Sequence, residues 1–296
     1  FSYLLFRHFF GHKILLQGMY INLFHLLISS ISLKLYPSRN LLPSYNIPKA
    51  HWHGATILVV LRFMISLSGL NDRQRTAADT IDGPVLILAG AGSGKTRTLT
   101  YRIAHMVDNL HIPQKSILAL SFTNKAAKEM KERVIGLLGK QKAKGITLST
   151  FHSLGLRILK KEIEKLGYHK NFTIYDTSDQ LAIVREGLKL WKADKNFDKK
   201  QVLSKIGYLK NQGISPEEFA NSNFFNDDDP YDHCANYIYE YYQEKLRFYN
   251  AVDFDDILFL TVKLFKDFPE VAKEYSTRFN YIMIDEYQDT NTLQFD

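Results

Sequence analysis

Ala89-Gly90-Ala91-Gly92-Ser93-Gly94-Lys95-Thr96 is the stretch of this sequence that decides the fold. A short apolar segment, Val85–Leu88, which we expect to be a strand, precedes it, and a segment with helical periodicity, Thr96–Asn109, follows it. A glycine-rich loop that ends in Gly-Lys-Thr between a strand and a helix is the pattern of a phosphate-binding Walker A loop. The first residue, Ala89, departs from the glycine usual there. A strand–helix turn that binds nothing is the alternative.

The composition of this loop suits it to hold a chain of phosphates. Glycines let the backbone turn its N–H groups toward phosphate oxygens, and the following helix adds the positive end of its dipole. We expect the ammonium group of Lys95 to reach the β- and γ-phosphates and the hydroxyl of Thr96 to bind Mg²⁺. ATP and Mg²⁺ are therefore the cofactors that the loop predicts.

Strand and helix patterns alternate on both sides of the loop. The expected elements are a helix at Asn71–Asp82 capped by Asn71, a strand at Ile117–Phe122, a helix at Asn124–Leu138, a strand at Ile146–Ser149 and a helix from there through Leu166. Because such alternation produces parallel strands covered by helices, the predicted fold class is α/β with a three-layer parallel sheet.

A second acidic motif follows much later in the chain. Tyr281–Ile284 is an apolar run that we expect to be a buried strand, and it ends in Asp285 and Glu286. Such a strand would place both carboxylates at the carboxyl edge of the sheet, beside the phosphate loop. Asp285 would then hold Mg²⁺, and Glu286 would orient and deprotonate the attacking water. The alternative is an acidic pair that caps the next helix.

The strand pattern is missing from about Asp176 to Asn250, where the sequence indicates several helices. After them, Asp253-Phe254-Asp255-Asp256 could suggest a metal site, but capping of a helix at Ile257–Lys266 is the favoured reading. The predicted domains are a leader at 1–63, the first part of the nucleotide-binding domain at 64–175, an all-helical insertion at 176–250 and the continuation of that domain at 251–296.

The first 63 residues differ in composition from the remainder. They contain no Asp or Glu and carry six basic residues, which supply most of the formal net charge of +7 over 296 residues. Bulk charge therefore gives little support for a nucleic-acid partner, and any such surface must be local. We expect this leader to be in-frame translation of upstream DNA and no part of the fold. An uncharged run at Ile14–Leu33 leaves a membrane span open, and a signal peptide is the third alternative.

Five blocks resemble the superfamily 1 DNA helicases of the UvrD/Rep/PcrA group, and the stretch from Thr150 through Gln180 looks closest to the Rep branch. The resemblance covers about Met64 to Asp296. The blocks, in chain order, are Leu70-Asn71-Asp72-Arg73-Gln74, the Walker A loop, Phe122-Thr123-Asn124-Lys125-Ala126-Ala127-Lys128-Glu129-Met130, Ser149-Thr150-Phe151-His152-Ser153 and Asp285-Glu286-Tyr287-Gln288-Asp289-Thr290-Asn291. The resemblance implies a RecA-like parallel sheet, as in other P-loop nucleotide hydrolases.

Several residue roles follow from the resemblance. Gln74 would read adenine, Arg97 would lie near the nucleotide, and Gln288 would sense the γ-phosphate. The catalytic set would be Lys95, Glu286 and Gln288. Residues at two strand ends would contact single-stranded DNA through aromatic faces, hydroxyls and amides. These residues are Phe122, Thr123, Asn124, Thr150, Phe151 and His152. Core packing of the two phenylalanines and a buried or helix-start position of His152 are the alternatives.

The resemblance implies an ATP-dependent 3′-to-5′ DNA helicase and single-stranded DNA translocase. Its partners would be single-stranded DNA and junctions of duplex with single strands, with no stable membrane partner. The single cysteine, Cys234, fits a reducing, cytoplasmic setting. Such motors need a second RecA-like domain that supplies arginine fingers, so these residues alone should bind nucleotide weakly. A RecB/AddA-like helicase–nuclease subunit and a non-catalytic nucleic-acid-binding fragment are the competing functions.

We predict that the natural first residue is Met64. The remaining residues carry every acidic side chain of the sequence, and a DNA motor has no physical need for an apolar leader. Intact-mass and N-terminal peptide analysis of the protein from its native cells tests this. Peptides that map before Met64, or recovery of the protein in the membrane fraction, would contradict it.

Overall fold

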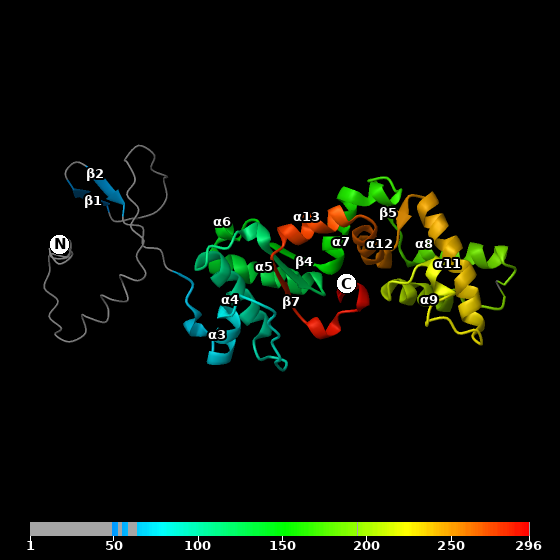
Figure 1. The fold of residues 1–296 in the computed structure, drawn as a ribbon, viewed down its shortest axis with the longest axis horizontal. Coiled ribbons are helices and arrows are strands. Elements are labelled where there is room, and N and C mark those ends of the chain that lie inside the picture. Colours follow the sequence, from blue (N-terminus) through cyan, green and yellow to red (C-terminus); the bar gives the residue numbers. More distant parts are fainter. Residues whose placement is uncertain (1–48, 53–54, 59–63, 194, 296) are drawn as a thin grey trace. The chain divides into compact units, whose positions relative to one another are not determined.

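The computed structural model describes residues 49–52, 55–58, 64–193 and 195–295, which fall into two units, Phe1–Ser66 and Leu67–Asp296 (Figure 1). In the first unit, β1 (Lys49–Trp52) pairs antiparallel with β2 (Ala55–Leu58). The span considered at Ile14–Leu33 lies outside the described residues. Among the residues that the structure describes, no helix is long and apolar enough to cross a membrane. The start at Met64 stays a prediction.

A three-stranded parallel sheet forms the centre of the second unit. Its middle strand is β3 (Ile117–Ser121), and β4 (Thr147–Thr150) and β7 (Tyr281–Ile284) pair with β3 on either side. All five residues of β3 are buried, as an apolar strand covered on both faces requires. This arrangement confirms the predicted α/β fold with a parallel sheet.

Helices cover the sheet. α4 (Lys95–Asp108) and α5 (Asn124–Leu138) pack on each other, and α5 also packs against β3 and β4. Side chains from α7 (Phe151–Glu162) and α13 (Pro269–Arg278) pack against Leu118 and Leu120 of the middle strand. The core therefore lies on both sides of β3, and the strand ends are left at the edge.

Side-chain caps define where these helices begin. α3 (Asp72–Asp79) starts at Asn71, whose side chain accepts from the Gln74 N–H while the Gln74 side chain accepts from the Asn71 N–H. Thr123 and Thr150 cap α5 and α7 in the same way, each accepting from an N–H three residues later. The expected cap at Asn71 and the expected helix at Asn124–Leu138 are confirmed, whereas α3 ends at Asp79 rather than Asp82.

The strand expected at Val85–Leu88 is wrong. No described strand pairs with this segment, and 67% of Leu86 and 87% of Leu88 are exposed. An apolar run becomes a strand only where a neighbouring strand satisfies its backbone, and β7 pairs only with β3 among the described strands. The phosphate loop therefore follows irregular chain instead of a strand.

The helical part of the chain contains α8 (Thr177–Leu190), α9 (Lys199–Asn211), α10 (Pro216–Phe219) and α11 (Pro230–Phe248). No strand is present among the described residues from Asp176 to Asn250, as expected. Two short strands that the sequence did not predict, β5 (Thr173–Ile174) and β6 (Ala251–Val252), pair in parallel just outside that range. This pairing holds the two ends of the helical segment together.

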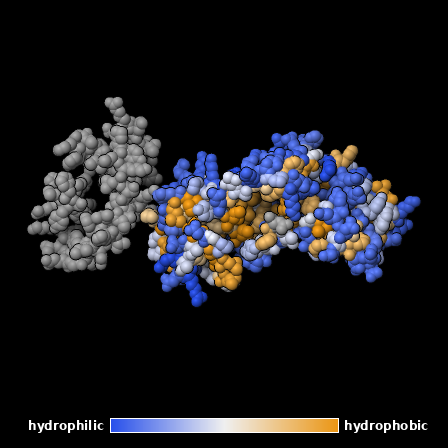
Figure 2. All heavy atoms as spheres, in the orientation of Figure 1, coloured by the Kyte–Doolittle hydropathy of each residue, from blue (hydrophilic) through white to orange (hydrophobic). Residues whose placement is uncertain are grey.

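The helical segment has its own apolar core, in which Ile206, Ile238 and Tyr239 are fully buried. Its visible surface is mainly hydrophilic, whereas hydrophobic residues gather on the sheet-containing part of the same unit (Figure 2). The division of the chain at 175 and 250 remains a prediction, and α9 of this segment also packs on the helix that follows it.

A buried charge cluster joins the helical segment to that next helix, α12 (Phe254–Asp267). The ammonium group of Lys210, fully buried in α9, lies 2.6 Å from Asp253 Oδ2 and 2.7 Å from Asp256 Oδ1. The hydroxyl of Tyr242 in α11 donates to the same Asp253 oxygen at 2.9 Å. Burial acts to lower the pKa of Lys210, but the two carboxylates outweigh it and raise that pKa. The cluster fixes α9, α11 and the start of α12 to one another.

We predict that Lys210→Met lowers the free energy of unfolding of the chain by about 3–5 kcal/mol, because it leaves two buried carboxylates without their cation. Urea denaturation measures the change. Lys263→Met is the matched control, since Lys263 pairs with Asp267 at 3.0 Å where both side chains are more than 40% exposed. That variant should change stability by at most ~1 kcal/mol. Equal losses in the two variants would contradict the prediction.

Candidate functional site

The glycine-rich loop has the backbone that its sequence predicts. Gly92 and Gly94 have φ angles of 72° and 88°, a region that side chains disfavour. The Ser93 hydroxyl donates to the Gly90 carbonyl at 2.6 Å, which closes the loop on itself. A Cβ atom on Gly94 would lie 2.8 Å from Gln74 Nε2, so a side chain there would displace the end of Gln74, while the φ angle is what requires glycine.

The acidic motif lies against this loop although the two are far apart in sequence. The Asp285 N–H donates to the Leu120 carbonyl at 2.9 Å, which continues the β3–β7 ladder by one residue. The Thr96 hydroxyl then donates to Asp285 Oδ2 at 3.2 Å. The ammonium group of Lys95 lies 3.3 Å from Glu286 Oε2. The structure thus brings the four predicted phosphate, metal and base residues together at the carboxyl edge of the sheet.

The two carboxylates have different surroundings. Burial raises the pKa of Asp285, while its bond from Thr96 opposes that rise. Hydrogen bonds from Gln288 and then Lys95 lower the pKa of Glu286, which keeps it ionised. The Gln288 amide donates to Glu286 Oε2 at 2.6 Å. Glu286 also has a φ of 56°, a conformation that is costly for a non-glycine residue and that clusters at functional sites.

The donor set at the loop fits Mg²⁺ bound together with phosphate. Thr96 and Asp285 present adjacent oxygens, the ligand type that Mg²⁺ prefers. Among the described residues, no group of three or more His, Cys, Asp or Glu side chains could hold a metal ion. Two protein ligands with phosphate oxygens and water completing an octahedron is the usual arrangement for Mg²⁺ at a nucleotide.

Gln74 and Arg97 both lie beside the loop. The Gln74 amide donates to the Ser93 carbonyl at 2.8 Å, and its oxygen accepts from the Asn71 N–H at 3.1 Å. Arg97 donates to the Gly69 carbonyl at 2.9 Å, and its guanidinium lies 5.6 Å from the centre of the Tyr101 ring. An amide oxygen can accept two hydrogen bonds and an amide nitrogen can donate two, so Gln74 could read adenine while keeping both of these bonds.

A second group of side chains lies where β3 and β4 end. The rings of Phe122 and Phe151 are 5.6 Å apart at 55°. The hydroxyls of Thr123 and Thr150 cap α5 and α7, so their first role in this structure is to start helices. Asn124 is exposed at the first position of α5. Phe151 also packs against Leu118 and Leu120, so core packing accounts for part of its position.

Phe254 is a member of this group that the sequence reading missed. Its ring stacks on His152, with centroids 3.9 Å apart and planes 15° from parallel, and 56% of the residue is exposed. Burial lowers the pKa of His152, which favours the neutral ring. The sequence did contain a signal for it: Phe254 lies within the string Asp253-Phe254-Asp255-Asp256, and capping a helix needs only the acidic residues of that string. The phosphate loop reaches the same edge of the sheet as this aromatic group, because Thr96 contacts Asp285 and Asp285 follows β7, which ends on the same side as β3 and β4.

Comparison with known proteins identifies the family of this chain. Residues 70–296 match the model of the UvrD/REP helicase N-terminal domain. Over 230 residues the chain is 47% identical to an ATP-dependent DNA helicase PcrA of Bacillus subtilis, covering 77% of this chain and 30% of that protein. PcrA helicases of Leuconostoc citreum and of Staphylococcus aureus strain Mu50 are 43% and 42% identical, over 77% of this chain and 30% and 31% of theirs. The chain thus spans about a third of the length of these relatives. The expected closeness to the Rep branch stays a prediction.

Proposed function

The chain belongs to the UvrD/REP helicase family, and we propose that it forms the first motor domain of an ATP-driven translocase on single-stranded DNA that unwinds duplexes in the 3′-to-5′ direction. The observation that carries this proposal is the contact of Lys95 and Thr96 with Glu286 and Asp285 at the sheet edge that also holds the aromatic group. The name ATP-dependent DNA helicase, which the relatives carry, supports it.

The residues at the loop suggest how hydrolysis would proceed. Lys95 would leave Glu286 and bind the β- and γ-phosphate oxygens, while the loop N–H groups hold the same chain. Thr96 and Asp285 would hold Mg²⁺, which neutralises phosphate charge when bound. Glu286, released from Lys95, would orient a water for in-line attack and take its proton. Gln288, already bonded to Glu286, is placed to respond to the γ-phosphate.

The aromatic group would provide the DNA track. Phe122, Phe151 and the stacked pair of His152 and Phe254 offer ring faces at the ends of neighbouring strands. Every base has a face that can stack on an aromatic ring, so such a track accepts any sequence. Asn124, exposed beside them, can bind a phosphate. The direction of movement, the junction substrates, a second motor domain and a cytoplasmic setting rest on the family resemblance.

Two substitutions test the nucleotide chemistry in the intact protein. Lys95→Ala should abolish ATP hydrolysis, because it removes the charge that meets the β- and γ-phosphates. Glu286→Gln should retain ATP binding and reduce turnover by about 10²- to 10⁴-fold, since the base is lost while its size is kept. Steady-state hydrolysis and equilibrium nucleotide binding measure both effects. Near-normal DNA-stimulated turnover in Glu286→Gln would show that another group is the base.

Three substitutions test the DNA track. Phe122→Ala, Phe151→Ala and Phe254→Ala should each weaken single-stranded DNA binding by up to ~1–3 kcal/mol without changing ATP affinity. Only Phe151→Ala should also lower the melting temperature clearly, because Phe151 packs on the core. Phe248→Ala is the matched control, since Phe248 is 79% exposed at the end of α11 and is not at the sheet edge. Unchanged DNA affinity in all three variants would leave core packing as the role of these rings.

A further inference from the structure

The segment after the acidic motif contacts the end of α9 residue by residue. The Asn291 amide donates to Asn211 Oδ1 at 2.8 Å. The Thr292 hydroxyl donates to Gln212 Oε1 at 3.2 Å. Two consecutive residues on each side are thus paired, although 80 residues separate the partners in sequence. The acidic motif and the helical segment therefore share a direct polar contact.

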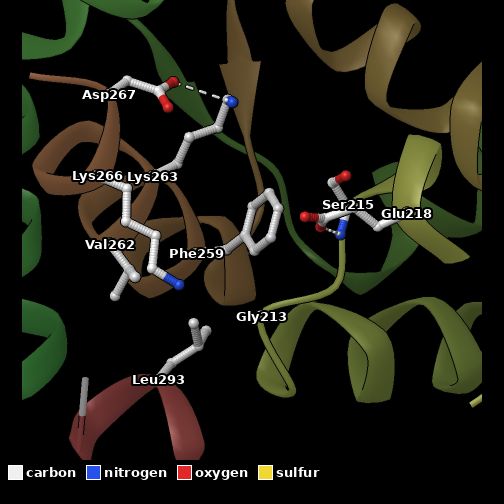
Figure 3. A pocket seen from close by; sticks show the side chains of 9 residues that line it. All are labelled: Gly213, Ser215, Glu218, Phe259, Val262, Lys263, Lys266, Asp267 and Leu293. Carbon is white, nitrogen blue, oxygen red and sulfur yellow. Dashed lines mark hydrogen bonds and ion pairs between the residues drawn. The ribbon is translucent and has the colours of Figure 1, made fainter. Parts of the chain in front are cut away.

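The next residue pair extends this contact beside a small cavity. A Cβ atom on Gly213, whose φ is +76°, would lie 3.3 Å from Leu293 Cδ2, so the chain turns closely over Leu293. Leu293, from α14 (Thr292–Phe295), points toward Val262 and Phe259 of α12 (Figure 3). A cavity of about 140 Å³ remains between them. Leu293 itself is buried in one apolar cluster with Leu258 and Phe259, so a displacement of α14 would act on α12 directly.

Asn211 joins this contact to α12. Its amide nitrogen donates to Asp255 Oδ1 and to the Gly207 carbonyl, each at 2.9 Å, while its oxygen accepts from Asn291. Both N–H groups and the oxygen are thus engaged. Asp255 approaches α9 this closely because Gly207 has no side chain: a Cβ atom there would lie 2.9 Å from Asp255 Oδ2. The bridge therefore needs three particular residue types on two helices.

Each end of the bridge leads to one of the two parts of the site. Asp255 follows Phe254, whose ring stacks on His152 at the aromatic edge. Asn291 follows the short helix η4 (Tyr287–Asp289), and the first bond of that helix runs from the Asp289 N–H to the Glu286 carbonyl at 3.0 Å. A chain of hydrogen bonds and short backbone steps thus connects the proposed base to an aromatic ring of the proposed DNA track.

The two sides of the bridge are held by different contacts. On the α12 side, the buried cluster of Lys210, Asp253 and Asp256 fixes the helix start to α9. On the other side, Asn291 is oriented by Gln294, whose N–H it accepts at 2.9 Å, in a four-residue helix that borders the cavity. A shift of the acidic motif would therefore be passed to Asn211 through Asn291, and Asn211 would pass it to the start of α12, which the buried cluster also bonds to α9.

We propose that Asn211 is a positioning residue that couples nucleotide hydrolysis at Glu286 to DNA contact at Phe254 and His152. This inference rests on the proposed function and adds to it a route between the two parts of the site. Asn211 touches neither nucleotide nor DNA in this proposal. It acts by holding the segment after the acidic motif and the start of α12 in one relative position.

Asn211→Leu in the intact protein tests the coupling, because it keeps the size of the side chain and removes all three hydrogen bonds. ATP hydrolysis is measured against the concentration of an oligothymidylate. Maximal DNA-stimulated turnover should fall by about 2- to 30-fold, the range in which residues along a coupling route act. Hydrolysis without DNA and the DNA concentration at half-maximal stimulation should stay unchanged. A merely structural role would move all three quantities, together with the melting temperature.

Exchanging the amide of Asn211 and the carboxylate of Asp255 provides a second test. Asn211→Asp removes the donor and faces Asp255 with a like charge, so stimulation should fall. Adding Asp255→Asn returns a donor to the pair, and the new carboxylate still accepts from Asn291, so stimulation should recover. Thr292→Val is the matched control, since it removes the neighbouring bond to Gln212 and leaves the bridge intact. It should keep full stimulation.

The outcomes separate this inference from the proposed function. Full stimulation in Asn211→Leu, or failure of Asp255→Asn to rescue Asn211→Asp, would overturn the coupling role alone, provided that the wild type is stimulated by DNA. A wild-type protein that hydrolyses ATP without any response to DNA would overturn the proposed function and this inference with it.

Discussion

Parallel pairing of β3 with both β4 and β7 is the constraint on which the site depends. Parallel strands all end at one edge, so three chain segments that are far apart in sequence deliver their next residues to the same place. Phe122 follows β3, Phe151 follows β4 and Asp285 follows β7. The Asp285 N–H bond to Leu120 carries the ladder to the carboxylate itself. Backbone pairing thus places the carboxylate of the acidic motif and the rings of the proposed DNA track at one edge.

Close approach of helices connects this edge to the helical segment. A Cβ atom on Gly155 of α7 would lie 2.9 Å from the Ile257 carbonyl oxygen, so the backbones of α7 and α12 can come this close only because residue 155 is glycine. Gly207 gives Asp255 the same access to α9. The buried Lys210 cluster then supplies a fixed geometry at the start of α12, since a cation with two carboxylate partners tolerates little displacement. Small residues and one buried charge cluster thus determine how the aromatic edge is held.

Contacts between residues close in sequence could be predicted from the sequence, whereas contacts between distant segments could be predicted only in part. The capping residues Asn71 and Thr123 act on N–H groups within three residues, so their helix starts follow from short patterns. Val85–Leu88 has strand composition, but a strand also needs a partner, which composition does not show. The stack of Phe254 on His152 joins residues about a hundred positions apart, and only the packing of α12 on α7 brings them together. The position of the acidic motif was predicted correctly because it follows a strand pattern. In parallel α/β folds such a strand ends at the edge of the sheet where the phosphate loop lies.

The pairing of Lys95 with Glu286 has an energetic consequence for the proposed cycle. Their side chains are 27% and 41% exposed, and ion pairs at such positions contribute at most ~1 kcal/mol. A bound phosphate chain offers several negative oxygens to Lys95 and to the loop N–H groups at once, so exchange of partners costs little compared with what binding supplies. Glu286, once released, keeps its bond from Gln288, which preserves its ionised form and its direction. The free state therefore holds the lysine and the base in a weak mutual pair, and nucleotide binding itself would free the base for the water.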